Sequence, residues 1–351
     1  MTENDQHIIL KLGKKFLLLA AILVILDILY RVTLYPRDRE RYCTLMQYAQ
    51  IPVKDSTDII YLGESSNHSY SPADKDQRAI SDMIDDMLPG HKVARLSKDA
   101  CHAGIYYDIL RNIPRKNPVQ TVIVTVNMRS FSSEWIYSDL EKPLQKEQIF
   151  MRKAPALYKR MLLAFKAYAH WTESERTKLV REGFKKQTLD LPYYFPYKNA
   201  NDWDHAIGSQ CYLYNGKKVS QDTIALTCHY IKDFAYQLDD KNPRIQDLDK
   251  IVKLCQRRGW NLIFNVLADN MDQIKVLAGP DLEFLMKSNV QYLIHRYEPQ
   301  GVKVVNNQYM VRDRDFFERE FPTEHYNQHG RHMVAEHIVE RLKRIEMIDT
   351  F

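Results

Sequence analysis

The sequence predicts an α/β domain in which helices cover a mostly parallel sheet. Short apolar runs rich in β-branched residues alternate with segments of helical periodicity, roughly over residues 55–130 and again over 245–345. Such alternation is typical of βαβ units, whose parallel strands are buried on both faces. The 351-residue chain is 45% hydrophobic, which is enough for one large domain with a sizeable core.

The predicted strands are short runs of apolar or β-branched residues bounded by turn residues. They are 58–62, 92–96, 120–126, 260–267 and 302–305. Between them, apolar residues recur at helical spacing, which predicts helices on both faces of the sheet and hence three layers. These helices are 73–88, a segment through Tyr107 and Leu110, 245–257, 282–294 and 328–345.

Residues 131–240 interrupt this alternation. They are rich in Tyr, Phe, Trp and Lys, with helical stretches around 154–184 and turn clusters at 191–196 and 199–202. We expect this region to be a helical, aromatic-rich insertion that caps the edge of the sheet. Most of its aromatic side chains are expected to belong to the core, as large apolar side chains usually do.

The N-terminal segment contains an unbroken apolar run from Phe16 to Leu26. A helix from about Leu12 to Tyr35 is long enough to cross a bilayer, which takes about 20 residues. Asp27 and Arg31 follow the run one helical turn apart, so they can pair. An amphipathic or buried helix of a soluble protein is the alternative, but the length of the segment favours a membrane anchor.

Basic residues before the apolar run favour a cytoplasmic N-terminus, because positive residues flank the cytoplasmic side of membrane helices. They are Lys11, Lys14 and Lys15. The expected organisation is a cytoplasmic tail and transmembrane anchor at 1–36, a juxtamembrane linker at 37–56 and the α/β domain at 57–351. That domain is expected outside the cytoplasm, in the periplasm or at the cell surface.

The charge pattern and the cysteines exclude some functions. The net charge of +5 comes from dispersed basic residues, which argues against a nucleic-acid partner. The five cysteines show no CxxC or Cys/His spacing of a zinc site, so no metal or cofactor is predicted. Outside the cytoplasm a disulfide between Cys211 and Cys228 is the most plausible pairing, and five buried thiols fit the sequence equally well.

Three places in the chain carry residues suited to acyl transfer. Gly63-Glu64-Ser65 follows the first strand, Asn127 ends the third, and His325 precedes the last helix. In a parallel sheet the carboxyl ends of strands meet at one edge, where ligands bind. There a histidine can take the proton of a serine nucleophile, while amide and backbone N–H groups hold the oxyanion. In a binding domain without acyl chemistry, with Ser65 only a helix cap, these residues would lie far apart.

At these positions the chain resembles the SGNH/GDSL hydrolase superfamily, which has a three-layer, flavodoxin-like fold. Gly63-Glu64-Ser65 is similar to the Gly-Asp-Ser of that family, and Thr125-Val126-Asn127 is similar to its Gly-x-Asn. His325-Tyr326-Asn327-Gln328-His329-Gly330 fits its His-x-Asn-x-x-Gly before the final helix. The resemblance implies Ser65 as nucleophile and His325 as general base. It also implies that the Asn127 side chain and the Ser65 backbone N–H hold the oxyanion.

The acid of the family lies three residues before the histidine, where this chain has Pro322. Glu324, next to His325, is the acid that we predict in its place. Asp313 and Asp315 are alternatives. An acid recruited from elsewhere in the chain and a Ser–His dyad without an acid are two more.

Two further residues are candidates for the site, Gly104 from the resemblance and Arg129 from its position in the sequence. Gly104 matches a later glycine of the family's second block and is a candidate oxyanion donor, although the oxyanion position itself falls near Cys101. Arg129 lies two residues after Asn127, where it is placed to contact an anionic group of the substrate.

The resemblance and the anchor together imply a membrane-tethered serine esterase or O-acyltransferase. Its substrates would be acyl esters, in the first place acetyl esters, of cell-envelope glycans. The departures from the family pattern imply an alternative, a catalytically degenerate accessory or acyl-relay subunit that would partner a membrane acyltransferase.

Overall fold

The computed structural model describes residues 3–168, 171–209, 213–214, 217–218 and 220–349. The described residues fall into two compact units. Residues 48–141 and those from 171 onward form one unit, here called the sheet unit. Residues 3–47 and 142–168 form the other, here called the helical unit.

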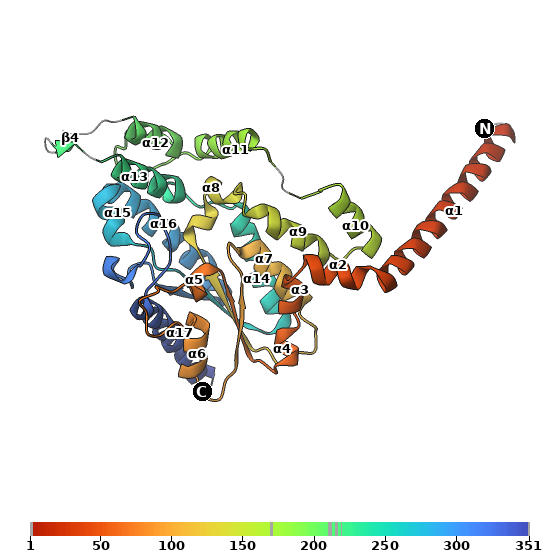
Figure 1. The fold of residues 1–351 in the computed structure, drawn as a ribbon, viewed down its shortest axis with the longest axis horizontal. Helices are drawn as coiled ribbons and strands as arrows, with labels where there is room; N and C mark the ends of the chain where they lie inside the picture. Colours follow the sequence, from red (N-terminus) through yellow and green to blue (C-terminus); the bar gives the residue numbers. More distant parts are fainter. Residues whose placement is uncertain (1–2, 169–170, 210–212, 215–216, 219, 350–351) are drawn as a thin grey trace. The chain divides into compact units, whose positions relative to one another are not determined.

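The sheet unit is built on a five-stranded, all-parallel sheet, as the alternation of strands and helices predicts (Figure 1). The strands, in the order β2-β1-β3-β6-β7, are β2 (Val93–Ser97), β1 (Ile59–Gly63), β3 (Thr121–Val126), β6 (Asn261–Val266) and β7 (Lys303–Asn306). From β1 the chain runs first to β2 on one side and then to β3 on the other. The carboxyl ends of β1 and β3 therefore form a topological switch point, where α/β sheets bind ligands.

Helices cover both faces of this sheet. On one face, α6 (Ile80–Met87) packs against α17 (Gln328–Asp349), over a core that includes Tyr61, Ile123 and Ile263. The other face carries α7 (Ala103–Asn112), α14 (Pro243–Arg258) and α16 (Gly279–Tyr297). Strands β1 and β3 are buried at every position, which explains why their sequences are continuous apolar runs rather than alternating ones.

The local sequence defines the ends of α14. The Asn242 side chain accepts a hydrogen bond from the Arg244 N–H, and Pro243 occupies the first helical position. Gly259 ends the helix in the left-handed conformation, with φ of 70°. The helix therefore starts and stops where the sequence signals place it.

The chain between β3 and α14 is mainly helical, and its helices divide between the two units. Helices α8, α11, α12 and α13 belong to the sheet unit, while α10 and most of α9 belong to the helical unit. The elements are η1 (Met128–Phe131), α8 (Ser133–Ile136), α9 (Glu141–Met151), α10 (Ala156–Ala164), α11 (Glu173–Lys186), α12 (Ala200–Gly208), β4 (Leu213–Tyr214), β5 (Lys217–Lys218) and α13 (Gln221–Phe234). Cys211 lies outside the described residues. Cys228 has a free thiol that donates to the Asp204 carbonyl oxygen, against the predicted pairing.

The helical unit begins with α1 (Glu3–Thr33), which is long and apolar enough to cross a membrane. Asp27 and Arg31 lie 3.0 Å apart on it, as their spacing predicts. The short helices α2 (Tyr35–Tyr42) and α3 (Leu45–Tyr48) follow. In the sheet unit, α4 (Ile51–Lys54) then leads into β1.

The remaining short elements lie in loops of the sheet unit. They are α5 (Ser65–His68), α15 (Met271–Leu277), η2 (Glu298–Gln300) and η3 (Asp313–Asp315). Of these, α5 directly follows β1 and starts with the predicted nucleophile.

Candidate active site

The end of β1 positions Ser65 at the first residue of α5. Gly63 permits this turn, because a Cβ there would lie 2.8 Å from Ser97 Oγ and 2.9 Å from the Tyr61 ring. Any side chain at position 63 would therefore force the side chains of Ser97 and Tyr61 to move. Ser65 itself is half-buried and faces a cavity, while Ser66 and Asn67 point into the protein.

His325 approaches Ser65 from the loop that precedes α17. Its Nε2 lies 3.0 Å from Ser65 Oγ, and its Nδ1 lies 2.7 Å from Glu318 Oε2. The Phe317 ring stacks on the imidazole at 5.8 Å between centroids. A serine, a histidine and a carboxylate are thus joined in one hydrogen-bonded series, which is the arrangement that activates a serine nucleophile.

Glu318, and not the predicted Glu324, is the carboxylate on His325. The chain folds back on itself here: Phe316 and Tyr326 form an antiparallel bridge, and the Phe317 N–H donates to the His325 carbonyl oxygen. This places Glu318 opposite the histidine although seven residues separate them. No spacing rule indicates a contact between Glu318 and His325, so sequence analysis did not identify Glu318.

Glu324 instead points to the protein interior, because neighbouring side chains in extended chain point to opposite sides. It is 1% exposed and accepts hydrogen bonds from Arg129 and from Asn127 Nδ2, the latter at 2.8 Å. The alternative acids also lie elsewhere: Asp313 accepts from Asn270, and Asp315 pairs with His329.

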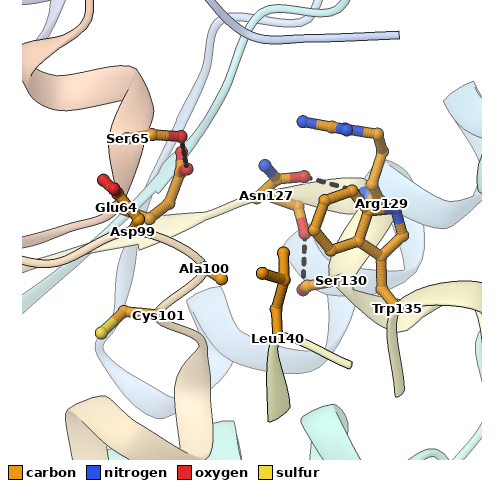
Figure 2. A pocket seen from close by; sticks show the side chains of 10 residues that line it. All are labelled: Glu64, Ser65, Asp99, Ala100, Cys101, Asn127, Arg129, Ser130, Trp135 and Leu140. Atoms are coloured by element: carbon orange, nitrogen blue, oxygen red, sulfur yellow. Dashed lines mark hydrogen bonds between the residues drawn. The ribbon is translucent and has the colours of Figure 1, made fainter. Parts of the chain in front are cut away.

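Asn127 is held from both ends of its amide. Its Oδ1 accepts from the Arg129 backbone N–H at 2.9 Å (Figure 2). Its Nδ2 donates to Glu324. The direction of the amide is therefore fixed, with one Nδ2 hydrogen committed to Glu324 and the other left for a ligand. Asn127 and Ser65 line the same cavity, so these residues do not lie far apart, as they would in a binding domain without acyl chemistry.

Arg129 is less available to a substrate than its sequence position suggests. It is 8% exposed, forms a two-pronged ion pair with Glu324 and lies 4.6 Å over the Trp135 ring. Burial alone would lower the pKa of this guanidinium, but Glu324 outweighs burial and raises it. The charge of Arg129 is balanced within the protein by Glu324, which also accepts the hydrogen bond from Asn127.

Gly104 does not reach the cavity. Its N–H donates to His102 Nδ1 at 3.1 Å, which caps α7. A Cβ at this position would lie 2.7 Å from Asp247 Oδ2, so the glycine permits close packing instead of donating to an oxyanion. The loop after β2 instead brings Ala100 and Cys101 to the cavity, and Ala100 adopts a positive φ of 59°.

The cavity has a volume of about 220 Å³ and lies at the carboxyl ends of β1, β2 and β3. Ser65 stands at one side, and the side chains of Trp135 and Leu140 stand opposite (Figure 2). Its lining consists of Glu64, Ser65, Asp99, Ala100, Cys101, Asn127, Arg129, Ser130, Trp135 and Leu140. The site thus combines a nucleophile with an apolar wall, a combination suited to an acyl group next to a polar acceptor.

Glu64 gives the Ser65 hydroxyl a second neighbour. Its Oε2 lies 2.8 Å from Ser65 Oγ, and the side chain is 4% exposed. The serine hydrogen can therefore point either to Glu64 or to His325. Only the second direction prepares the serine for attack, because the histidine must accept that proton.

Buried carboxylic acids lie behind Arg129. Burial raises the pKa of Asp233 to about 7, and Trp135 Nε1 donates to this side chain at 3.0 Å. Burial, together with the nearby Glu324, raises the pKa of Asp269 well above its ordinary value. Trp135, which forms one wall of the cavity, is thus hydrogen-bonded to Asp233, a carboxyl group that is protonated in weak acid.

Arg331 fixes both loops of the site, a role that the sequence did not indicate. It is fully buried, pairs with Asp74 at 2.9 Å and donates to the carbonyl oxygens of Ser69 and Tyr326. Ser69 lies in the loop after α5, and Tyr326 follows His325. One side chain therefore connects the segment that carries the serine to the segment that carries the histidine.

No protein-family model matches the chain, and a search of the curated proteins finds no relative. The resemblance to SGNH hydrolases consequently depends on the sequence motifs alone.

Proposed function

We propose that this chain is a membrane-anchored serine esterase or O-acyltransferase of the SGNH type, acting outside the cytoplasm on acyl esters of cell-envelope glycans. The observation that carries the proposal is the series Ser65–His325–Glu318, at 3.0 Å and 2.7 Å. Its position at the switch point of a parallel sheet supports the same conclusion. The glycan substrate and the location follow from the family resemblance and the apolar helix α1.

In the first half of the reaction, Ser65 Oγ attacks the ester carbonyl carbon. His325 Nε2 takes the serine proton, and Glu318 stabilises the imidazolium through Nδ1. The negative charge that develops on the carbonyl oxygen is held by the Ser65 backbone N–H and the free hydrogen of Asn127 Nδ2. The bond between the acyl carbon and the glycan oxygen then breaks, and His325 gives its proton to that oxygen, which leaves as a hydroxyl group.

In the second half, water or a sugar hydroxyl attacks the acyl-serine. His325 removes the proton of this acceptor, and the serine leaves with that proton. Attack by water makes the protein an esterase, and attack by a sugar hydroxyl makes it a transferase. Glu324 and Arg129 take no part in proton transfer and keep the Asn127 amide in position.

An assay of the full-length protein in detergent or membranes on a chromogenic acetyl ester tests this proposal. We expect turnover that Ser65→Ala and His325→Ala each reduce by 10³-fold or more, since the two residues act as a unit. His68→Ala is the matched control: His68 lies on the same short helix and pairs with Asp99, so its removal should leave turnover nearly unchanged.

A folded protein without turnover would instead support the accessory-subunit alternative. One observation favours this alternative: the Gly104 N–H, a candidate oxyanion donor, donates to His102 instead. A mere loss of folding is distinguished by the thermal unfolding of the same samples.

A further inference from the structure

We propose that α10 is a membrane-surface helix that inserts Tyr158, Met161 and Phe165 among the lipids beside α1. The partner of this surface is the bilayer itself, with anionic headgroups. The inference rests on the membrane anchoring proposed above and is independent of the chemistry at Ser65.

α10 is fixed to the helical unit close to α1. The Leu157 N–H, in the first turn of α10, donates to Asp27 Oδ1 at 2.7 Å, and the two helices contact each other. Lys159 is buried on the inner face, where it donates to the Phe150 carbonyl oxygen and to Tyr35 Oη. These contacts fix which face of α10 points outward.

The outward face carries large apolar side chains. Tyr158 is 50% exposed, Met161 46% and Phe165 77%, and their spacing places them on one side of the helix. The opposite side, with Ala156, Lys159 and Leu163, is buried. Exposed apolar surface of this kind marks an interaction site, since isolated soluble proteins rarely keep it.

The charges around α10 favour lipid as the occupant. From Gln148 to Thr172 the sequence contains no acidic residue, whereas Glu147 and Glu173 lie just outside this stretch. The exposed cations in it are Arg152, Lys153, Arg160 and Lys166. Basic residues combined with an apolar, aromatic face are typical of helices that lie at an anionic membrane surface.

The level of α10 along α1 also favours lipid. Asp27 is 12 residues beyond Lys15, which is about 18 Å along a helix that rises 1.5 Å per residue. The hydrocarbon layer of a bilayer is about 30 Å thick, so this distance is shorter than the layer. A surface attached at Asp27 therefore meets acyl chains or the boundary with the headgroups. The apolar residues of α1 at this level, Ile28 and Leu29, are each 55% exposed. The surface of α1 and the outward face of α10 are therefore both apolar and exposed.

The test uses the full chain in vesicles of phosphatidylcholine and phosphatidylglycerol, with or without bromine on the acyl chains. Phe165→Trp and Tyr158→Trp report on α10, and Leu18→Trp reports on α1, where Leu18 is 63% exposed. Tyr194→Trp is the standard for an aromatic side chain in water, because Tyr194 is 90% exposed on the sheet unit. The signal of each variant is its emission minus that of the parent protein, which has four tryptophans.

We expect brominated lipid to quench the emission of both α10 variants to more than half the extent seen for Leu18→Trp, and acrylamide to quench it far less than that of Tyr194→Trp. Quenching by acrylamide alone would place the α10 face in water and overturn the inference. Protection from both quenchers would also overturn it, because protein would then cover the face. If Leu18→Trp is not quenched by brominated lipid either, the proposed anchor fails as well, and that failure is seen separately.

Discussion

At the scale of single residues, His325 decides what the site can do. Its two ring nitrogens face different partners: Ser65 at Nε2 and Glu318 at Nδ1. A carboxylate at Nδ1 keeps that nitrogen protonated, so that Nε2 is free to accept the serine proton. Glu318 is half-exposed, so solvent and salt screen its charge. We therefore expect it to act on His325 more by orienting the imidazole than by electrostatic attraction.

Replacing Glu318 by Gln tests this role. We expect kcat/KM on an acetyl ester to fall by about 10²–10⁴-fold, because the amide can hold the imidazole in the wrong tautomer. Glu320→Gln is the matched control, since Glu320 lies exposed in the same loop and contacts the Arg319 backbone instead of His325. A loss below threefold for Glu318→Gln would show that the site works as a Ser–His dyad.

Asp233 makes the stability of the sheet unit dependent on pH. Its pKa of about 7 in the folded protein exceeds the ordinary 3.8 of the unfolded chain, so the folded state holds a proton that the unfolded state releases. The contribution of Asp233 to the free energy of unfolding is fully present below about pH 4 and is lost as the pH rises to about 7. The shift corresponds to on the order of 4 kcal/mol.

Asp233→Asn should therefore raise the melting temperature at pH 8 relative to the parent protein and leave it nearly unchanged at pH 4. The Asn side chain can still accept the hydrogen bond from Trp135 Nε1. Melting curves from pH 4 to 8 provide the measurement. Equal pH dependence of the two proteins would mean that Asp233 does not carry the proton.

At the scale of elements, the site depends on two loops that carry no regular structure of their own. Residues 69–79 follow α5, and residues 316–326 carry Glu318 and His325. Arg331, at the start of α17, contacts both, through Ser69, Asp74, Asp76 and Arg78 on one side and Tyr326 on the other. The helix therefore positions the loops instead of merely covering the sheet.

We expect Arg331→Met to lower the free energy of unfolding by about 3–5 kcal/mol, because Asp74 and several carbonyl groups would be left buried without a partner. Arg78→Met is the matched control: its ion pairs with Asp76 and Asp86 are exposed, so the cost should be under about 1 kcal/mol. Urea unfolding of the three proteins measures both values. Similar costs for the two variants would contradict the positioning role of Arg331.

At the scale of the whole molecule, the sheet could be predicted because its strands are buried on both faces. Each of them stands within one or two residues of its predicted position, and α14, α16 and α17 follow their apolar periodicity. The predicted helix 73–88 is shorter in the structure, since residues 71–79 bind Arg331 as a loop. The periodicity of α6 was correct, but nothing local marked its true start.

The parts that escaped prediction depend on contacts between residues distant in sequence. Ser65, Asn127 and His325 were found because each follows or precedes an element at the same edge of the sheet. Glu318 was missed because a reversal of the chain brings it to His325. Glu324 was wrongly predicted as the acid because adjacency in sequence does not imply contact between side chains. The split of 131–240 between two units likewise depends on packing that no local pattern records.

The most direct test of the central claim is to label the full-length protein with a fluorophosphonate probe and to locate the modified residue by mass spectrometry. We expect one adduct on Ser65, absent in Ser65→Ala and strongly reduced in His325→Ala. Labelling of a different serine, or no labelling of a protein that unfolds cooperatively, would contradict an activated Ser65.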